Sequence, residues 1–169
     1  MKHALVFLLS FWAFALLPAP TVRAQSEAHS PMTASAESFC EQFQVIANAS
    51  SASFKPLRGK VEGIDIWKGQ QPLPGTANCI VYGRRGDASY ICSSAMVRGN
   101  DQVQQLFNTL KSQVQKCLGD GWAANDYTAR RGDPSVAFSK AEADYDVRVA
   151  VKSLEGRPEK EITLTVARP

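Results

Sequence analysis

Apolar residues recur at helical spacing between Gly99 and Gly119, while the opposite face carries Gln, Asn, Lys and Ser. We therefore predict one long amphipathic helix that ends at Leu118. Asn100 or Asp101 is its expected cap, with Gln104 in the capping-box position, and Gly119 is its expected C-terminal stop. The stripe consists of Val103, Leu106, Phe107, Leu110, Val114, Cys117 and Leu118.

A second helical pattern covers residues 35–49, where the apolar positions again share one face. These positions are Ala36, Phe39, Cys40, Phe43, Ile46 and Ala47. Cys40 and Cys117 thus both lie on faces that are predicted to point into the core.

Period-two alternation is clearest near the C-terminus, at residues 145–152 and 161–166, and it is typical of strands with one buried and one solvated face. A looser alternation predicts one strand over Val61–Trp67, and a further strand is expected after Trp122, through Thr128. Pro72-Leu73-Pro74-Gly75 is a strong turn signal.

Residues 79–92 read as a tight β-hairpin around Arg84-Arg85-Gly86-Asp87. A reversal centred between Arg85 and Gly86 places Cys79 opposite Cys92 at a non-hydrogen-bonded pair. The Cα atoms of such a pair approach to roughly 4.5 Å, close enough for a disulfide. The alternative is two free, buried thiols.

If Cys79 bonds to Cys92, the remaining pair is Cys40–Cys117, which would join the two predicted helices. A zinc site built from the four thiolates is the alternative, although the sequence has no C-x₂-C spacing.

The tetrad Arg84-Arg85-Gly86-Asp87 returns as Arg130-Arg131-Gly132-Asp133. The repeat is either a remnant of duplication or convergence on a favourable turn sequence. Each copy contains Arg-Gly-Asp, but the turn explains that tripeptide without an adhesion function.

Together these patterns predict an α+β fold in which two helices pack on one face of a mainly antiparallel sheet. The expected order is α-β-β-β-α-β-β-β-β, stapled by disulfides. Residues 35–169 are the predicted single domain. They follow a signal peptide over residues 1–24 and a disordered leader over residues 25–34.

Charge narrows the classes of partner. The formal net charge of +3 falls to +1 when Lys2 and Arg23 leave with the signal peptide. We therefore expect neither nucleic acid nor an anionic membrane surface as a partner, because both require a basic excess. We also expect an exported protein, periplasmic or secreted, with no membrane association after signal cleavage.

The sequence offers few residues that could act as catalytic groups. The only two histidines are His3 and His29, both ahead of the predicted domain, so we expect no histidine-based catalysis, metal site or cofactor. What remains is a Ser-Lys arrangement or carboxylate chemistry, and the enzyme that we consider is a histidine-free hydrolase of cell-envelope glycans that uses paired carboxylates beside tryptophan. Its candidates are Glu62, Asp65, Asp120 and Asp126.

Some of these motifs occur together in small exported bacterial proteins of unassigned function, which the chain resembles over about fifty residues. The shared features are Leu73-Pro74-Gly75, Cys79, Tyr90-x-Cys92, the helix that ends at Cys117-Leu118, and Trp122. The resemblance implies a disulfide-stapled fold and a periplasmic location, and it implies no activity.

The hairpin is apolar on both faces, which is typical of a covered central hairpin or of a partner surface. We therefore expect a non-catalytic domain that binds another protein, as an inhibitor, immunity or accessory factor does. The candidate partner-binding residues are Tyr82, Arg84, Arg85, Ile80 and Ile91.

Overall fold

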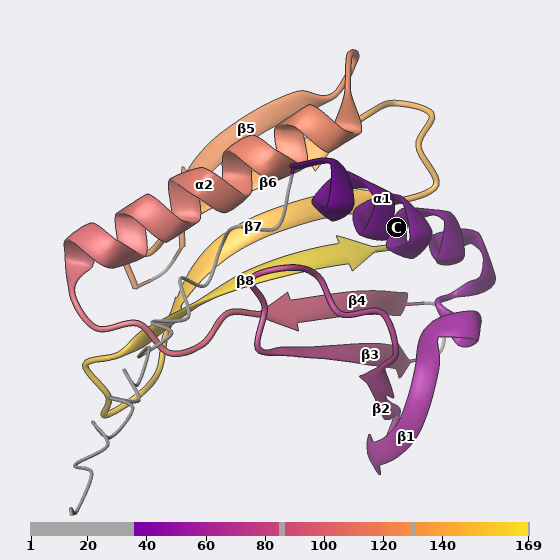
Figure 1. Cartoon of the computed structure of the whole chain (residues 1–169), viewed down its shortest axis with the longest axis horizontal. Helices are drawn as coiled ribbons and strands as arrows, with labels where there is room; N and C mark the ends of the chain where they lie inside the picture. Colours follow the sequence, from indigo (N-terminus) through magenta and orange to yellow (C-terminus); the bar gives the residue numbers. More distant parts are fainter. Residues whose placement is uncertain (1–35, 85–86, 130, 169) are drawn as a thin grey trace, which may run out of the picture.

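The structure is a computed structural model that describes residues 36–84, 87–129 and 131–168. It has an α+β fold with an eight-stranded sheet in the order β1-β2-β3-β4-β8-β7-β6-β5, in which every neighbouring pair is antiparallel (Figure 1). The helical elements are α1 (Ala36–Asn48), the 3₁₀ turns η1 (Ala49–Ala52) and η2 (Lys55–Leu57), and α2 (Asn100–Leu118). The strands are β1 (Arg58–Gly63), β2 (Ile66–Gly69), β3 (Asn78–Arg84), β4 (Asp87–Ser93), β5 (Ala123–Thr128), β6 (Pro134–Ser139), β7 (Asp146–Ser153) and β8 (Lys160–Ala167).

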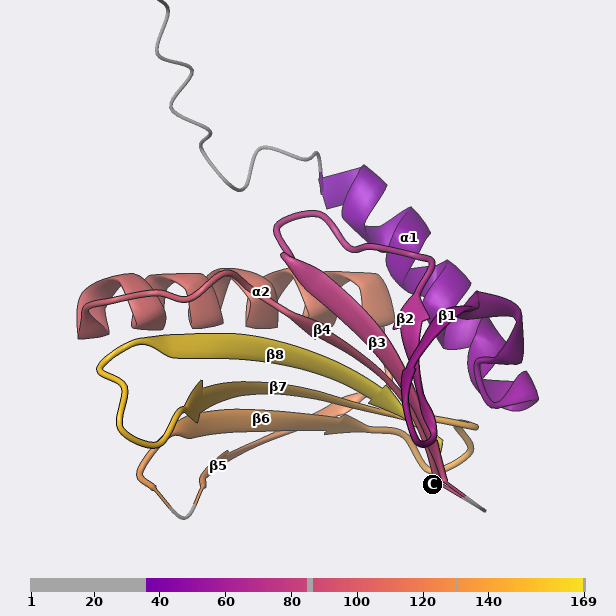
Figure 2. The same ribbon diagram turned by 90° about the horizontal axis from the view of Figure 1, so that it is seen from below.

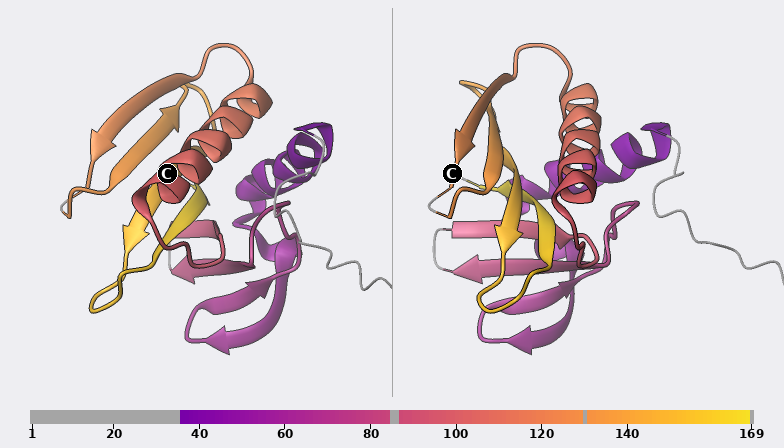
Figure 3. Two further views of the ribbon diagram at one scale, coloured as in Figure 1. Left: turned by 60° about the vertical axis from the view of Figure 1, so that its left-hand side comes forward. Right: turned by 90° about the vertical axis from the view of Figure 1, so that its left-hand side faces the viewer.

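Both helices lie on the same face of the sheet, which we call the inner face (Figure 2). The alternation predicted for the C-terminal strands is confirmed, because one side of β7 and β8 is buried in the core that the helices cover. The sheet twists strongly, so that β6 and β7 run across the direction of β3 and β4 (Figure 3). The buried strand residues include Val147, Val149, Val151, Ile162, Leu164 and Val166, and the buried helix residues include Phe39, Phe43, Ile46, Val103, Phe107, Leu110 and Val114.

The predicted strand order was wrong at residues 61–67, which form the β1–β2 hairpin rather than one strand. Val61 pairs with Trp67, and Gly63 pairs with Ile66 across the turn. Asp65 takes a left-handed conformation with φ 59°, which short polar residues tolerate better than most. Among the described residues, four strands therefore precede α2, not three.

The start of α2 also differs from the prediction. Gly99 occupies the N-cap position, and no side chain of the described residues caps the helix. The carbonyl of Gly99 accepts a hydrogen bond from Val103 N at 3.1 Å, whereas the Gln104 side chain donates to Asn108 instead of closing a capping box. The predicted end is confirmed, since α2 stops at Leu118 with Gly119 at the C-cap, where φ is 69°.

Both predicted disulfides are present. Cys79 faces Cys92 in the β3–β4 register with a Cα–Cα distance of 4.1 Å. Cys40–Cys117 joins α1 to the last turn of α2 with a Cα–Cα distance of 5.0 Å. Because every cysteine is in a disulfide, the zinc alternative is excluded: none remains as a thiolate ligand.

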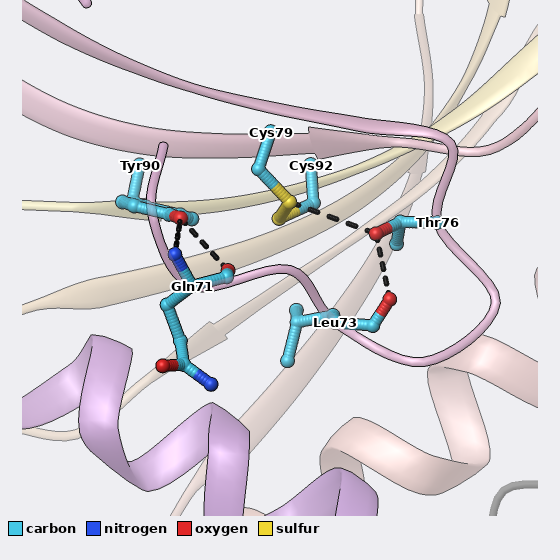
Figure 4. The surroundings of a disulfide bond; sticks show 6 residues. All are labelled: Gln71, Leu73, Thr76, Cys79, Tyr90 and Cys92. Atoms are coloured by element: carbon cyan, nitrogen blue, oxygen red, sulfur yellow. Dashed lines mark hydrogen bonds between the residues drawn. A yellow bond between two sulfur atoms is a disulfide. The ribbon is translucent and has the colours of Figure 1, made fainter. Parts of the chain in front are cut away.

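A loop covers the inner face of the β3–β4 hairpin at its disulfide end (Figure 4). Leu73 is buried there, and Thr76 Oγ1 donates to the Leu73 carbonyl at 2.7 Å. The Tyr90 hydroxyl meets the backbone of Gln71 at the other end of the same loop. Burial of the ring raises the pKa of Tyr90, against the opposing effect of the Gln71 backbone hydrogen bond. The apolar inner face of the hairpin is thus explained by packing.

The two Arg-Arg-Gly-Asp copies occupy different structures. In the first, Arg84 and Asp87 pair directly at the ends of β3 and β4. In the second, the five-residue connection between Thr128 and Pro134 holds Asp133, which is buried although Asp87 is exposed. Convergence on a turn sequence therefore accounts for the repeat better than duplication of a structural unit does.

Candidate binding pocket at the turn end of β3 and β4

A cation-rich cavity of about 820 Å³ lies on the inner side of the sheet at the end where β3 and β4 reverse. We call it the Arg58 pocket. It combines residues from η1–η2, the β1–β2 hairpin, the ends of β3 and β4, and the end of the chain. The lining residues are Ser53, Lys55, Arg58, Asp65, Trp67, Gly83, Arg84, Asp87, Ala88 and Arg168.

The Arg58 guanidinium is held in one orientation. Its Cζ atom lies 4.0 Å from the centre of the Trp67 ring, in a cation–π arrangement. Its Nη2 donates to the Ser53 carbonyl at 3.3 Å. Its Nε is buried and has no hydrogen-bond acceptor among the described residues. Stacking and one backbone hydrogen bond thus fix the side chain at the expense of an unpaired N–H.

Two consecutive residues in the connection from η1 to η2 adopt the left-handed conformation. Ser53 has φ 54° and Phe54 has φ 56°, and neither is glycine. Phe54 is fully buried and its ring lies 6.0 Å from that of Tyr90, which accounts for its tolerance of this conformation. The bend presents both the carbonyl and the hydroxyl of Ser53 to the pocket arginines, since Arg168 Nη1 contacts Ser53 Oγ at 3.3 Å.

Gly83 makes close approach to Arg58 possible. A Cβ atom at this position would lie 2.7 Å from Arg58 Nη2 and 3.3 Å from Trp67 Cζ3. The Gly83 N–H donates to the Asp65 carbonyl at 2.9 Å, which fixes the β1–β2 turn beside the pocket. The absence of a side chain at residue 83 is therefore required for the stacked arginine.

A second cavity, of about 430 Å³, lies against the outer face of the sheet at the same end. We call it the outer hollow. Tyr82, Ser89, Thr165 and Arg148 line it from four different strands. Its lining includes three residues of the Arg58 pocket, namely Asp87, Ala88 and Arg168. The two cavities therefore meet at the rim of the sheet.

The candidate partner-binding residues fall into three groups. Tyr82 lines the outer hollow, and Arg84 lines the Arg58 pocket. Ile80 and Ile91 pair with each other on the outer face, where both are half-buried. Arg85 lies outside the described residues.

Sequence reasoning missed Arg58 and Arg168, and it considered Trp67 only as an aromatic neighbour of carboxylates. The signal that was available is the proximity of Trp67 to the arginine that opens the same hairpin. Arg168 gives no such signal, because it reaches this end of the sheet only through the pairing of β8 with β4.

The four carboxylates considered for glycan hydrolysis come from two parts of the fold: Glu62 and Asp65 from the β1–β2 hairpin, and Asp120 and Asp126 from the segment between the end of α2 and β5. Asp65 lines the Arg58 pocket, where the second carboxylate is Asp87. Glu62 is exposed on β1, and Asp120 is exposed after α2. Asp126 pairs with Lys111 Nζ at 2.6 Å. Asp65 lines the Arg58 pocket, whereas Glu62, Asp120 and Asp126 line neither that pocket nor the outer hollow.

Within residues 36–84, 87–129 and 131–168, no group of three or more His, Cys, Asp or Glu side chains is arranged to hold a metal ion. The described part of the chain contains no helix long and apolar enough to cross a membrane. No family model, curated protein sequence or solved structure matches the chain.

Proposed function

We propose that this chain is an exported, non-catalytic domain that binds another protein, as an inhibitor, an immunity protein or an accessory factor does. The observation that carries the proposal is the meeting of the Arg58 pocket and the outer hollow at one end of the sheet. Arginine, tryptophan and tyrosine are enriched at protein interfaces and at their energetic centres. Arg58, Trp67, Tyr82 and Arg84 supply these residue types together.

Export is supported by the apolar N-terminal stretch and by the two disulfides, which are compatible with an oxidising compartment. The Cys40–Cys117 and Cys79–Cys92 bonds also hold the helices and the β3–β4 hairpin in place. A contact surface on such a framework loses little conformational entropy on binding, which favours affinity.

The test is affinity capture from the exported fraction of the source cells, with tagged wild-type protein and single variants. Tyr82→Ala and Arg84→Ala alter the outer hollow and the Arg58 pocket respectively, whereas Lys116→Ala alters an exposed residue of α2 and is the control. A protein that wild type and Lys116→Ala recover should fall about tenfold in one or both of the other variants. The recovered protein, once purified, should also bind the purified wild-type chain. Equal recovery by all four proteins would contradict this surface as the binding site.

A further inference from the structure

Two guanidinium groups converge on Ser53. Arg58 donates to its carbonyl oxygen at 3.3 Å, and Arg168 contacts its hydroxyl at 3.3 Å. Like charges that share one neutral residue repel each other, and nothing in the Ser53 side chain neutralises them. An anion beside both groups would remove that repulsion.

The remaining charges of the Arg58 pocket leave a positive excess. Lys55 and Arg84 add two cations to Arg58 and Arg168, while Asp65 and Asp87 supply two carboxylates. Four cations against two anions leave a formal charge of +2. A pocket with this positive excess attracts an anion in preference to a neutral or cationic group.

Stacking on Trp67 and one hydrogen bond to the Ser53 carbonyl set the orientation of Arg58, while its buried Nε finds no acceptor among the described residues. A buried N–H without a partner is destabilising, so stability alone does not favour this arrangement. Left-handed Ser53 and Phe54 add a second cost beside the same group. Such costs are found together where a group is held ready for a ligand.

We infer that the Arg58 pocket binds a carboxylate group of a partner protein, either an Asp or Glu side chain or the chain terminus. The planar guanidinium matches the two oxygens of a carboxylate, and Arg168 and Arg84 provide additional charge. This inference rests on the proposed function, since a protein partner supplies the carboxylate.

The test is an NMR titration of the uniformly ¹⁵N-labelled, disulfide-intact protein at low salt, followed through the Trp67 indole N–H signal. Three dipeptide probes separate the sources of the carboxylate. Acetyl-Gly-Glu-amide carries a side-chain carboxylate, acetyl-Gly-Gln carries a terminal one, and acetyl-Gly-Gln-amide carries none. A saturable shift with either of the first two and none with the third is the expected result. Inorganic phosphate is the fourth probe, and tighter binding of phosphate than of both carboxylates would overturn the assignment.

Two variants locate the bound group. Arg58→Lys keeps the charge but loses the planar fork, and Arg168→Gln removes the second guanidinium. Each should weaken carboxylate binding about tenfold, because each loses a charge-assisted hydrogen bond to the carboxylate. Lys116→Ala should bind as wild type does, and a wild-type pattern of backbone amide signals shows that each variant is folded. No saturation, equal shifts with the neutral probe, or unchanged affinity in both folded variants would overturn the inference.

The inference and the proposed function fail separately. If no carboxylate binds while Tyr82→Ala or Arg84→Ala still lowers the recovery of a partner, the proposed function stands and the carboxylate site falls. If carboxylates bind as expected but no protein depends on these residues for capture, the carboxylate site stands and the proposed protein-binding function falls.

Discussion

The Tyr90 hydroxyl donates a hydrogen bond to the carbonyl oxygen of Gln71 at 2.8 Å and accepts one from the Gln71 N–H at 2.9 Å. One buried side chain therefore satisfies both backbone groups of a loop residue nineteen positions earlier in the chain. A side chain at residue 69 would occupy the place of this hydroxyl, which accounts for Gly69. The pair fixes the loop that covers the Cys79–Cys92 disulfide (Figure 4).

Tyr90→Phe should lower the free energy of unfolding by about 1–3 kcal/mol, because the donor and the acceptor of Gln71 both lose their partner in a partly buried position. The matched control is Tyr127→Phe, since Tyr127 is exposed on the edge strand β5 and its loss of a hydroxyl should change stability by less than about 0.5 kcal/mol. Urea unfolding measures both. Equal effects of the two substitutions would show that the Tyr90 hydroxyl does not hold the loop.

The two disulfides should contribute unequally. Cys40–Cys117 closes a loop with a sequence separation of 77 residues, and Cys79–Cys92 closes one of 13. In the chain-entropy model these correspond to about 4.5 and about 3 kcal/mol. Replacement of each pair by alanine, followed by urea unfolding of both variants, should therefore show the larger loss for the Cys40/Cys117 variant. The opposite order would mean that native packing of the hairpin, rather than loop closure, determines the contribution.

Local periodicity was sufficient to predict the elements that carry the core. The stripe that includes Val103 and Val114 and the alternation of Val147, Val149 and Val151 each reflect one buried face, and these residues are buried in the structure. The Cys79–Cys92 pair followed from the position of the turn. These predictions succeeded because each depends on residues close together in the chain.

The β1–β2 hairpin and the Arg58 pocket were not predicted, for different physical reasons. Ile64 lies in the turn and is 90% exposed. Because it is apolar and stands between Val61 and Ile66, it completed an alternating pattern that predicts one continuous strand. Arg58 reaches Gly83 only after β1, β2 and β3 pair, and Arg168 reaches them only after β4 pairs with β3 and β8 with β4. Periodicity and turn signals in a single sequence do not predict which residues far apart in the chain become neighbours.

Gly83→Ala tests how the pocket is built. The new Cβ would lie 2.7 Å from Arg58 Nη2, so the guanidinium must shift from the Trp67 ring, and the substitution should cost about 0.5–1 kcal/mol of stability, the contribution of a cation–π contact at an accessible site. In an Arg58→Ala background the same change should cost much less, because the obstructing atoms are gone. The double-mutant cycle, measured by urea unfolding, isolates this coupling.

Gly63→Ala is the control for that cycle. Its Cβ would meet the nearest atom, in the Ile66 side chain, at 3.6 Å, which is an ordinary contact. It should show no coupling to Arg58→Ala. If Gly83→Ala likewise shows no coupling, Arg58 does not occupy the position beside Gly83 in solution.

Asp133→Asn should remove a pH-dependent contribution to stability. Burial acts to raise the pKa of Asp133, but hydrogen bonds from Lys160 and Ser153 outweigh it and lower the pKa below its usual value. The carboxylate accepts from Lys160 Nζ at 2.9 Å and from Ser153 Oγ and N at 2.8 and 3.0 Å. Since the folded-state pKa is depressed, the stabilisation is complete above the unfolded-state pKa, about 3.9, and is lost as the pH falls through the folded-state value.

At neutral pH the loss in Asp133→Asn should be about 2–3 kcal/mol, because hydrogen bonds to a charged group are broken in a buried position. The difference between wild type and variant should stay constant down to about pH 4 and shrink below it. Asp87→Asn is the control from the other Arg-Arg-Gly-Asp copy. Asp87 is exposed, so the free energy of unfolding of the Asp87→Asn variant should stay within about 0.5 kcal/mol of the wild-type value. Thermal unfolding of all three proteins between pH 2 and 7 measures these stabilities. If the stability difference between wild type and Asp133→Asn did not shrink in acid, the carboxylate charge would not be what holds β7 and β8 to this turn.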